Sequence, residues 1–391
     1  MGDLFEEQLQ ALRARSLHRK MREIGSAQGA EVQIVGRQLI NFSSNDYLGL
    51  ASDPILRKAA IAAIEEFGVG AGASRLISGT QSPHLALESA LARWKRLPAA
   101  ICFSSGYAAA VGTLPALASK HDVIILDKLC HASLIDGARL SGATLRVFPH
   151  NHLGKLESHL EWARREYPEA RVVIVTESVF SMDGDRAPLR ELVDLKNRFN
   201  AFLLLDEAHA IGVLGAHGRG LAAELGLENQ VDAQFGTLSK SLGVSGGYVC
   251  GSRDLIDWLV NRARSFIFTT APPAALAAAA TAAIHFLISE EGETRRKTLW
   301  RRIVQLRKLL PTGKDEFGKP SAAIIPWIVG GEQRAVNLAR ALRQEGFFAP
   351  AIRYPTVPEG AARLRITVSA SHTALQIASL GDAVQRLSGQ G

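Results

Sequence analysis

The sequence predicts an α/β protein built on a mostly parallel β-sheet with helices on both faces, followed by a smaller α+β domain. Between residues 100 and 250, short β-branched and apolar runs alternate with segments of helical periodicity. This alternation is typical of parallel strands joined by helical crossovers. The length of 391 residues, with 47% hydrophobic content, suffices for one large and one smaller core. We expect an N-terminal segment over 1–50, which packs with the small domain and the active site, a large domain over 51–290 and a small domain over 291–391.

The individual elements follow from these periodicities. The predicted strands of the sheet are AAICF (99–103), DVIILD (122–127), TLRVF (144–148), RVVIVTE (171–177), AFLLLDE (201–207) and GGYVCG (246–251). Helices are expected at 108–119, 155–167 and 188–199, where apolar residues recur at three-and-four spacing. A long helical stretch over 272–310 should lead into the small domain. The elements predicted there are SAAIIPWIV, a helix near 332–345, FFAPAI, RLRITV and a last helix from Thr373.

Composition argues against several classes of protein. The net charge of +7 comes from short, scattered basic clusters without interleaved aromatic residues. This favours a solvated surface and anionic substrates over a nucleic-acid-binding face. The three cysteines lie far apart, with no C-x-x-C pair, so we expect no disulfide framework and no metal site. The first 24 residues lack a signal peptide's apolar stretch, and no window reaches ~18 apolar residues, so we expect a soluble cytoplasmic protein without membrane contact.

The strongest chemical signal is GTLSKSLGVSGG at 236–247, where Lys240 is flanked by serines and glycines. A ligand can approach a lysine closely among such small residues, whereas an isolated lysine is more often a surface residue. The segment TLSKSLGVSG is similar to the lysine motif of pyridoxal-phosphate enzymes with the class II aminotransferase signature. This cofactor requires a lysine for covalent attachment, an acid near its pyridine nitrogen, hydrogen bonds to its ring oxygen and a phosphate cradle.

Candidates for the acid and the phosphate cradle occur at predicted strand ends. Asp206 lies at the carboxyl end of AFLLLDE, where it would keep a pyridine nitrogen protonated, and His209 follows three residues later. Ser105, Gly106 and Tyr107 follow the strand AAICF where a helix begins. Backbone N–H groups at a helix N-terminus can bind phosphate, although an ordinary helix cap is the more common use of such a segment.

Two further segments place side chains where they would face the ring of the cofactor. His131, in DKLCHASL, is expected at the end of a strand, positioned to lie over a planar ring, although core or turn histidines are more common. Ser181 follows RVVIVTE, with Glu177 and Asp183 nearby. We expect Ser181 to bond the ring oxygen together with His209; a simple turn at Asp183 explains the same segment, and both interpretations can hold.

Two motifs suggest nucleotide binding but lack the required spacing. The Gly-rich segment 68–79 has Ala73 where G-x-G-x-x-G needs glycine, and no predicted strand precedes it. The DEAH run at 206–209 also occurs in a helicase family, but no G-x-x-x-x-G-K-[ST] phosphate loop accompanies it. Neither a dinucleotide site nor a helicase is therefore expected.

Taken in order, these segments resemble the alpha-oxoamine synthase family over nearly the whole chain. The matching stretches are AQGAEV (27–32), NFSSNDYLGL (41–50), SSGY, HASL, VFSMDGDRAPL, DEAHAIGVLGAHGRG, TLSKSLG and AIRYPTVPEGAARLRIT (351–367). The resemblance implies fold type I of the pyridoxal-phosphate-dependent transferases and a homodimer with shared active sites. It also implies a decarboxylative condensation of L-alanine with a pimeloyl thioester, as in biotin biosynthesis, with coenzyme A or an acyl carrier protein as the carrier.

Carried over position by position, the resemblance assigns a role to each candidate. Lys240 carries the cofactor and then removes the α proton of the substrate, Asp206 pairs with the pyridine nitrogen, and His131 stacks on the ring. The other cofactor contacts are expected from Ser105, Gly106, Tyr107, Ser181, His209, Thr237 and, from the second subunit, Thr269 or Thr270. The substrate contacts are expected from Arg19, Asn45, His131, Arg353 and Thr356.

The N-terminal substrate contact departs from the pattern of the family. An ungapped alignment on AQGA puts Met21 where the biotin-pathway enzymes have a basic residue, with Arg19 and Arg22 alongside. We assign the contact to Arg19.

Several alternatives share parts of this apparatus. Glycine C-acetyltransferase, 5-aminolevulinate synthase and long-chain base synthases use the same cofactor machinery, but VFSMDGDRAPL and NFSSNDYLGL favour the alanine and pimeloyl pair. An aminotransferase of the same fold would need no thioester. A nucleic-acid-binding module on this scaffold would require loss of Lys240 or Asp206, and both are present. The acyl carrier and the chain length depend on pocket shape, which the sequence does not determine.

Overall fold

The computed structural model describes residues 2–310 and 322–388. The chain divides into two compact units. The large unit comprises Leu50–Ser181 and Asp185–Arg296, and the small unit comprises Met1–Gly49, Met182–Gly184 and Lys297–Gly391. The N-terminal segment and the C-terminal residues therefore share one unit.

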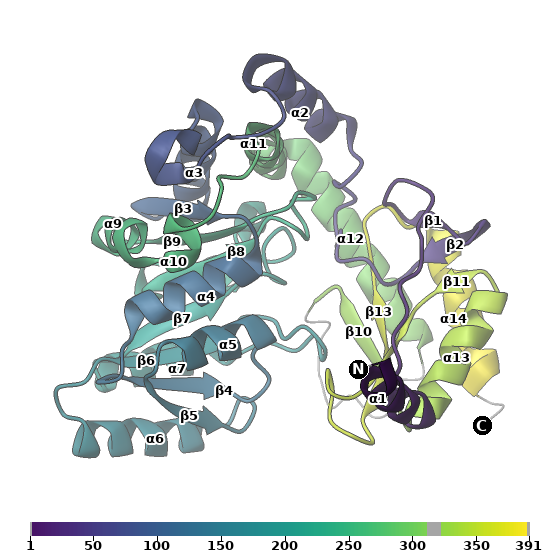
Figure 1. The fold of residues 1–391 in the computed structure, drawn as a ribbon. Coiled ribbons are helices and arrows are strands. Elements are labelled where there is room, and N and C mark those ends of the chain that lie inside the picture. The colour runs from purple at the N-terminus through teal and green to yellow at the C-terminus, as the bar shows by residue number, and fades with distance from the viewer. Residues whose placement is uncertain (1, 311–321, 389–391) are drawn as a thin grey trace. The chain divides into compact units, whose positions relative to one another are not determined.

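The large unit is built on a seven-stranded, mostly parallel sheet (Figure 1). In spatial order its strands are β3 (Ala99–Phe103), β9 (Gly247–Gly251), β8 (Ala233–Thr237), β7 (Phe202–Asp206), β6 (Val172–Glu177), β4 (Val123–Asp127) and β5 (Thr144–Phe148). Strand β9 runs antiparallel to both of its neighbours, β3 and β8, and the other pairings are parallel. The predicted α/β class is confirmed, and the six predicted strands are present. Strand β8 was not predicted.

Helices pack on both faces of this sheet, which explains its continuous apolar strands. Ile124 and Leu126 of β4 belong to a buried cluster that also contains residues of α4, α5 and α9. Val123 and Ile125 point to the opposite face and are equally buried. A strand buried on both faces has no polar side, so its sequence reads as an apolar run rather than an alternation.

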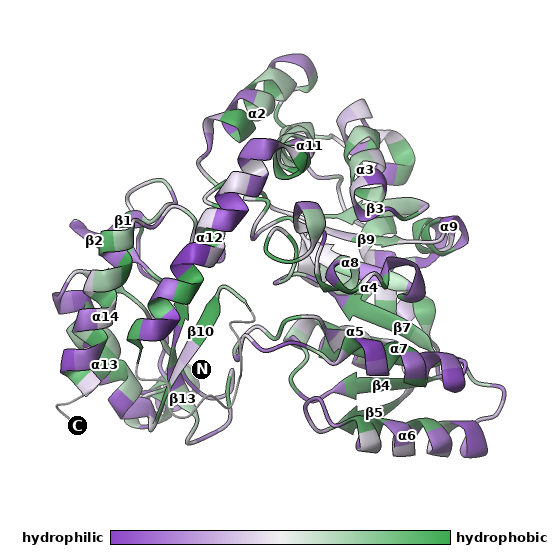
Figure 2. Ribbon diagram, turned by 180° about the vertical axis from the view of Figure 1, so that it is seen from behind, coloured by the Kyte–Doolittle hydropathy of each residue, from purple (hydrophilic) through white to green (hydrophobic). Residues whose placement is uncertain are grey.

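The three helices predicted at 108–119, 155–167 and 188–199 begin and end within two residues of those limits, as α4, α6 and α7. Its helices are α2 (Pro54–Phe67), α3 (Ser82–Lys95), α4 (Gly106–Leu117), α5 (Ala132–Leu140), α6 (Leu153–Glu166), α7 (Leu189–Arg198), α8 (Leu221–Leu225), α9 (Arg253–Arg262), α10 (Arg264–Ile267) and α11 (Ala274–Ile288). Short π and 3-10 turns occur at Arg75–Gly79, Ala216–Gly218 and Glu228–Gln230. Figure 2 shows hydrophilic and hydrophobic residues alternating along α6, as expected for a helix with one face on a sheet.

The long helical stretch expected over 272–310 is two helices. Helix α11 ends before Ser289, where the backbone is extended, and α12 (Glu290–Leu309) starts at a bend of 77°. Helix α11 packs against α2 and α3 and buries most of its alanines, as expected of a core helix. Within the described ranges no single helix is long and apolar enough to cross a bilayer, and only this bent pair passes by length and composition.

The small unit contains two three-stranded sheets and their helices, in agreement with the predicted α+β pattern. One sheet has the order β1 (Glu31–Ile34), β2 (Arg37–Asn41), β11 (Phe347–Phe348), and the other has the order β10 (Ile324–Gly330), β13 (Ala362–Thr367), β12 (Ala351–Ile352). Its other helices are α1 (Gly2–Ala14), α13 (Glu332–Gln344) and α14 (Ala374–Ser388). The pairing of β2 with β11 ties the N-terminal hairpin to the C-terminal part of the chain. The first residue of the predicted strand, Ser321, lies outside the described residues.

A buried ion pair at the end of β7 supports the turn that follows this strand. Lys95, at the end of α3, is 1% exposed, donates a hydrogen bond to the carbonyl of Arg219 and lies 4.0 Å from the carboxylate of Glu207. Glu207 also accepts hydrogen bonds of 2.9 Å from the backbone N–H groups of Leu221 and Ala222 at the start of α8. The pair thus connects α3, the end of β7 and α8.

We predict that Lys95→Met lowers Tm by roughly 6–20 °C, because removing one partner of a buried ion pair costs about 3–5 kcal/mol. Thermal unfolding followed by circular dichroism measures the effect. The matched control is Lys120→Met at an exposed position, where we expect a change within about 0.5 kcal/mol. Equal Tm values for the two variants would contradict the structural role of the pair.

Candidate active site

A pocket of about 260 Å³ lies at the carboxyl edge of the large unit's sheet, slightly below the ~300–1,000 Å³ of typical small-molecule sites. The ends of β6, β7 and β8 and the N-termini of α4 and α5 form its walls. It is lined by Ser105, Gly106, Tyr107, His131, Ser133, Glu177, Asp206, Ala208, His209, Phe235, Thr237, Ser239 and Lys240. Eight of the ten residues predicted to contact the cofactor are in this group.

Two carboxyl groups lie side by side in the floor of the pocket. Asp206 and Glu177 are the last residues of neighbouring parallel strands and are paired in the register of the sheet. Burial raises the pKa of Asp206 to about 6, although Lys240 and the N–H of Ala208 act in the opposite direction. Burial, and then the charge of Asp206, raise the pKa of Glu177 well above its ordinary value. The pair therefore holds one negative charge more readily than two.

Glu177 positions a second element of the site. Its Oε1 accepts a hydrogen bond of 2.6 Å from the backbone N–H of His131, the residue before α5. Glu177 had no predicted role, and the pocket also contains four residues that were not predicted to belong to the site, Ser133, Ala208, Phe235 and Ser239. The one available signal was position, because Glu177 ends a predicted strand beside the strand of Asp206.

The structure places His131 at the start of a helix, four residues beyond the end of β4, rather than at the strand end that the sequence suggested. Its Nδ1 accepts a hydrogen bond from the N–H of Ser133 and so caps α5. Burial, together with the charge of Lys240, lowers the pKa of His131. In this neutral ring the proton resides on Nε2, because Nδ1 is an acceptor.

The N-terminus of α4 and the start of β9 approach each other closely on one side of the pocket. Ser105 caps α4 by accepting a hydrogen bond of 3.0 Å from Ala108, so the ordinary helix-cap interpretation holds. A Cβ at Gly247 would lie 2.5 Å from the Ser105 carbonyl oxygen, so glycine is required there. The first N–H groups of α4, at Gly106 and Tyr107, have no partner inside the helix and are donors for an anion.

Lys240 lies in a compact loop between β8 and β9. The hydroxyl of Thr237 is hydrogen-bonded to Ser239 at 2.8 Å and donates to the carbonyl of Gly246 at 2.9 Å. The N–H of Gly243 donates to the carbonyl of Lys240, which closes the turn after the lysine. These bonds hold the lysine beside Asp206. The charge of Lys240 opposes the effect of burial on the pKa of Asp206.

Two of the predicted cofactor residues are not in the wall of this pocket. Ser181 follows β6 by four residues, and Thr269 follows α10. Neither is among the residues that line the pocket. Their assignment to the ring oxygen and to a partner's phosphate site stays a prediction.

The predicted substrate residues other than His131 lie in the small unit. Asn45 accepts hydrogen bonds from Tyr47 and Arg365. Arg353 and Arg19 line a separate pocket of that unit. The N–H of Thr356 donates to the carbonyl of Arg353 in a turn. Among the residues that the structure describes, no group of three or more histidine, cysteine, aspartate or glutamate side chains is arranged to hold a metal ion.

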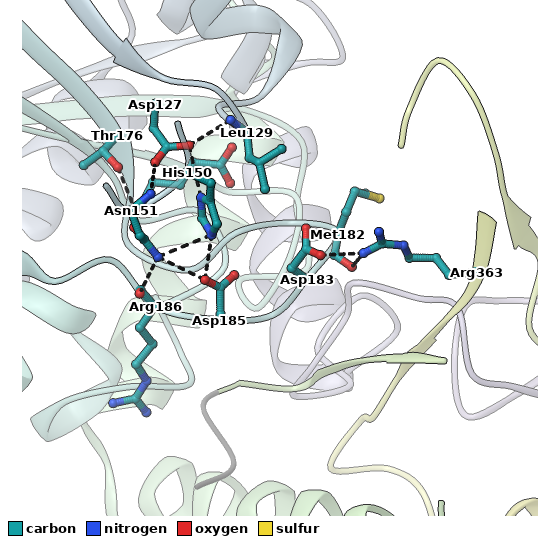
Figure 3. A network of polar contacts seen from close by, with 11 residues as sticks. Asp127, Leu129, His150, Asn151, Thr176, Met182, Asp183, Asp185, Arg186 and Arg363 are labelled. Atoms are coloured by element: carbon teal, nitrogen blue, oxygen red, sulfur yellow. Dashed lines mark hydrogen bonds and ion pairs between the residues drawn. The ribbon is translucent and has the colours of Figure 1, made fainter. Parts of the chain in front are cut away.

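A polar network outside the pocket connects the turns after β4, β5 and β6 (Figure 3). The ring of His150 lies between two carboxylates, with Nδ1 3.1 Å from Asp127 and Nε2 2.8 Å from Asp185. Asn151 adds hydrogen bonds to the same two side chains. Asp127 also accepts from the N–H of Leu129, in the turn that leads to His131. The network therefore anchors the turns that carry His131 and Ser181.

The comparisons with known proteins agree with this geometry. A family profile for class I and II aminotransferases matches residues 37–384. The chain belongs to this family. Membership makes it an enzyme, with pyridoxal phosphate as its cofactor, as the sequence predicts.

The family also contains relatives that match almost the entire chain. The 8-amino-7-oxononanoate synthases of Pelobacter propionicus and Geobacter metallireducens are each 46% identical over 95% of this chain, and over 95% and 94% of their own lengths. Both are alpha-oxoamine synthases, so the predicted resemblance is confirmed.

Solved structures of the family confirm fold type I. Serine palmitoyltransferase of Sphingomonas wittichii has a TM-score of 0.92 and 33% identity over 99% of this chain and 97% of its own. The 8-amino-7-oxononanoate synthase of Francisella tularensis has a TM-score of 0.75 and 28% identity over 90% of this chain and 98% of its own.

The network around His150 makes stability depend on pH. Burial opposes the charge on the ring, but hydrogen bonds with Asp127 and Asp185 outweigh it and raise its pKa to about 10. A histidine whose pKa is raised on folding stabilises the protein fully below its unfolded pKa, ~6.5, and the contribution is lost as pH rises towards 10. We therefore predict that the Tm deficit of His150→Gln is largest near pH 6 and shrinks by pH 9.5.

Thermal unfolding of the variant and the wild type at both pH values measures this deficit. His121→Gln, at an exposed turn, is the control and should leave Tm within about 2 °C at either pH. A deficit for His150→Gln that is the same at pH 6 and pH 9.5 would show that the charged histidine is not the stabilising form.

Proposed function

We propose that this enzyme condenses L-alanine with a pimeloyl thioester to give 8-amino-7-oxononanoate, carbon dioxide and the free thiol. The observation that carries this proposal is the 46% identity to 8-amino-7-oxononanoate synthases over 95% of the chain. The condensation forms one carbon–carbon bond at the α carbon of alanine, and the carboxylate leaves as carbon dioxide. The thioester loses its thiol, which takes up a proton.

The residues of the pocket fit pyridoxal phosphate. Asp206 has a raised pKa in its buried position, and a cationic ring nitrogen beside it would favour its ionised form. Lys240, in the same pocket, supplies the amine for covalent attachment. The N–H groups of Gly106 and Tyr107 supply donors for the phosphate, and Thr237, whose hydroxyl donates to Gly246, is assigned to the same region of the pocket. Ser181 and His209 are assigned to the ring oxygen.

When bound, the cofactor supplies an electron sink for the bonds that break at the α carbon of the amino acid. The chain's own residues then control the protons. Lys240 removes the proton from the α carbon, because it is the one lysine among the described residues that line the pocket. Asp206 would hold a proton at the ring nitrogen. His131, neutral and protonated on Nε2, would lie over the ring and would donate a hydrogen bond to the reacting carbonyl.

The residues of the small unit are assigned to the substrate. Arg353 and Thr356 bind the substrate carboxylate, and Asn45 contacts the substrate. The biotin-pathway enzymes have a basic residue where this chain has Met21, and we assign the contact of that residue to Arg19. We further propose a cytoplasmic homodimer in which Thr269 of each chain serves the other's phosphate site. The proposed donor carriers are coenzyme A and an acyl carrier protein, and the proposed domain limits are 1–50, 51–290 and 291–391.

A second candidate function is a long-chain base synthesis with L-serine. The TM-score of 0.92 to serine palmitoyltransferase, against 0.75 to the solved 8-amino-7-oxononanoate synthase, favours it. The higher sequence identity to the oxononanoate synthases, 46% against 33%, favours the alanine reaction. Backbone similarity reports the fold, whereas substrate choice depends on side chains in the pocket, so we give the sequence identity more weight.

Thiol release by the purified holoenzyme tests the substrate pair. We expect release with L-alanine and pimeloyl-coenzyme A. Release only with glycine and acetyl-coenzyme A would reassign the chain as a glycine C-acetyltransferase, and release only with L-serine and palmitoyl-coenzyme A would reassign it as a long-chain base synthase. Conversion of added alanine to pyruvate without any thioester would identify an aminotransferase.

We predict that Lys240→Ala abolishes the visible absorbance of the protein-bound cofactor and lowers turnover by at least roughly 10⁴-fold, because the variant lacks both the attachment point and the general base. Absorbance spectra and thiol release measure the two effects. Lys155→Ala, on the exposed surface of α6, is the matched control and should keep both. Unchanged colour and activity in Lys240→Ala would refute the assigned role.

A further inference from the structure

The small unit contains a second pocket, of about 420 Å³, whose walls are strongly basic. We call it the basic pocket. It is lined by His18, Arg19, Lys20, Arg22, Val336, Ala339, Arg340, Arg343, Phe348, Ala349, Pro350, Ala351 and Arg353. Six of these side chains are lysine or arginine, and none of the lining residues that the structure describes is acidic.

One wall of the basic pocket is a single face of α13. Its residues Val336, Ala339, Arg340 and Arg343 are spaced three, four and seven positions apart, so they project from the same side of the helix. Arg340 and Arg343 are neighbours of like charge on that face, which costs rather than adds stability. Arg343 gains from its position in the last turn of the helix, but that explains only one of the six cations.

Another wall is the segment 18–22, and three contacts made by Ser16 and Arg19 hold this part of the chain against the C-terminal part of the unit. Arg353 donates to the carbonyl of Ser16, whose hydroxyl in turn donates to the side chain of Gln333 at 2.7 Å. Arg19 donates to the carbonyl of Tyr354 at 3.4 Å. The basic pocket is therefore assembled by interactions within the small unit.

Among the residues that the structure describes, few acidic side chains compensate the positive charges of the basic pocket. Burial, and then the charges of Arg19 and Arg22, lower the pKa of Arg353, while Glu332 acts weakly in the opposite direction. Two acidic residues of the same unit are paired elsewhere, Glu359 with Arg15 and Glu345 with Arg386. Cations that repel one another in a concave site create a strong positive potential, which an anionic ligand relieves.

The composition of the pocket indicates which anion it suits. A single substrate carboxylate needs one arginine fork, whereas six cations suit a ligand with several negative charges. Val336, Phe348 and Pro350 add an apolar surface between the cations, which an organic ligand uses and an inorganic ion does not. Both proposed acyl carriers join their thiol arm to a phosphate. An acyl carrier protein has this single phosphate, whereas coenzyme A has further phosphates on its nucleotide.

We propose that the basic pocket binds the phosphate groups of the acyl donor, with Lys20, Arg22, Arg340 and Arg343 as their partners. This inference rests on the proposed function, because it requires a thioester donor that carries phosphate. It leaves Arg353 and Arg19 with their assigned substrate contacts and adds a separate role for the other four cations. The preference for a phosphorylated donor then comes from the small unit.

The test compares two donors in the full-length holoenzyme. Pimeloyl-coenzyme A carries the phosphates, and the pimeloyl thioester of N-acetylcysteamine carries none. In the wild type we expect the KM for the first donor to be at least tenfold lower than for the second. We define the KM ratio as the KM for the N-acetylcysteamine thioester divided by the KM for pimeloyl-coenzyme A. In the double variant Arg340→Glu/Arg343→Glu we expect this KM ratio to fall at least tenfold, because charge reversal replaces attraction of phosphate by repulsion. Arg334→Glu, on the same helix but outside the pocket, is the control and should keep the ratio.

A direct binding measurement keeps the two proposals separable. Adenosine 3′,5′-bisphosphate should bind the wild-type holoenzyme in calorimetry, and the double variant, with its cofactor absorbance intact, should bind at least tenfold more weakly. An unchanged KM ratio with unchanged bisphosphate binding would overturn the basic pocket as a phosphate site while the proposed reaction stands. Bisphosphate binding that depends on Arg340 and Arg343 in a protein that turns over neither thioester would support the pocket and refute the reaction.

A third donor, pimeloyl-acyl carrier protein, identifies the source of the phosphate. A rise in KM for both phosphorylated donors would assign the basic pocket to the single phosphate that joins the thiol arm to its carrier. A rise for pimeloyl-coenzyme A alone would assign it to the nucleotide end.

Discussion

The large unit's candidate site depends on one electrostatic constraint, the packing of two buried carboxyl groups beside one lysine at the edge of a parallel sheet. Glu177 and Asp206 are neighbours because β6 and β7 run in the same direction and end together. Burial disfavours charge on both, and Lys240 favours it. A cationic neighbour favours the charged form of Asp206. A charged Asp206 in turn suits a ring nitrogen that must remain protonated. The same arrangement keeps Glu177 available as a neutral acceptor for the backbone of His131.

The loops around this pair are held by hydrogen bonds that come from outside the pocket. His150, between Asp127 and Asp185, connects the turns after three neighbouring strands, and one of those turns leads to His131. The Lys95 and Glu207 pair supports the turn after β7, in which His209 lies. The small unit has a different character, because its basic pocket collects cations rather than carboxylates.

Much of the fold could be predicted because its strands are apolar runs, and such runs indicate a sheet covered on both faces. Strand β8 could not, because its residues AQFGT include glycine, glutamine and alanine, which are poor strand formers. It is a strand only because β7 and β9 pair with both of its edges. For β8, tertiary packing overrides local preference. The break at Ser289 does have a local signal, because the Ser289 hydroxyl accepts a hydrogen bond from the N–H of Gly292 and acidic residues occupy the first turn of α12.

The sequence by itself determined the chemistry of the site, because a lysine among small residues and an acid at a strand end are local patterns with a covalent and an electrostatic meaning. Tertiary structure decided which further groups join them. Glu177 gains its raised pKa from the strand beside it, and His150 gains its charge from carboxylates 23 and 35 residues away in the chain. The basic pocket likewise unites 18–22 with α13, more than 300 residues later. These pKa shifts and the basic pocket arise from burial and from neighbours in space. The spacing of residues along the chain does not indicate which distant residues will become neighbours.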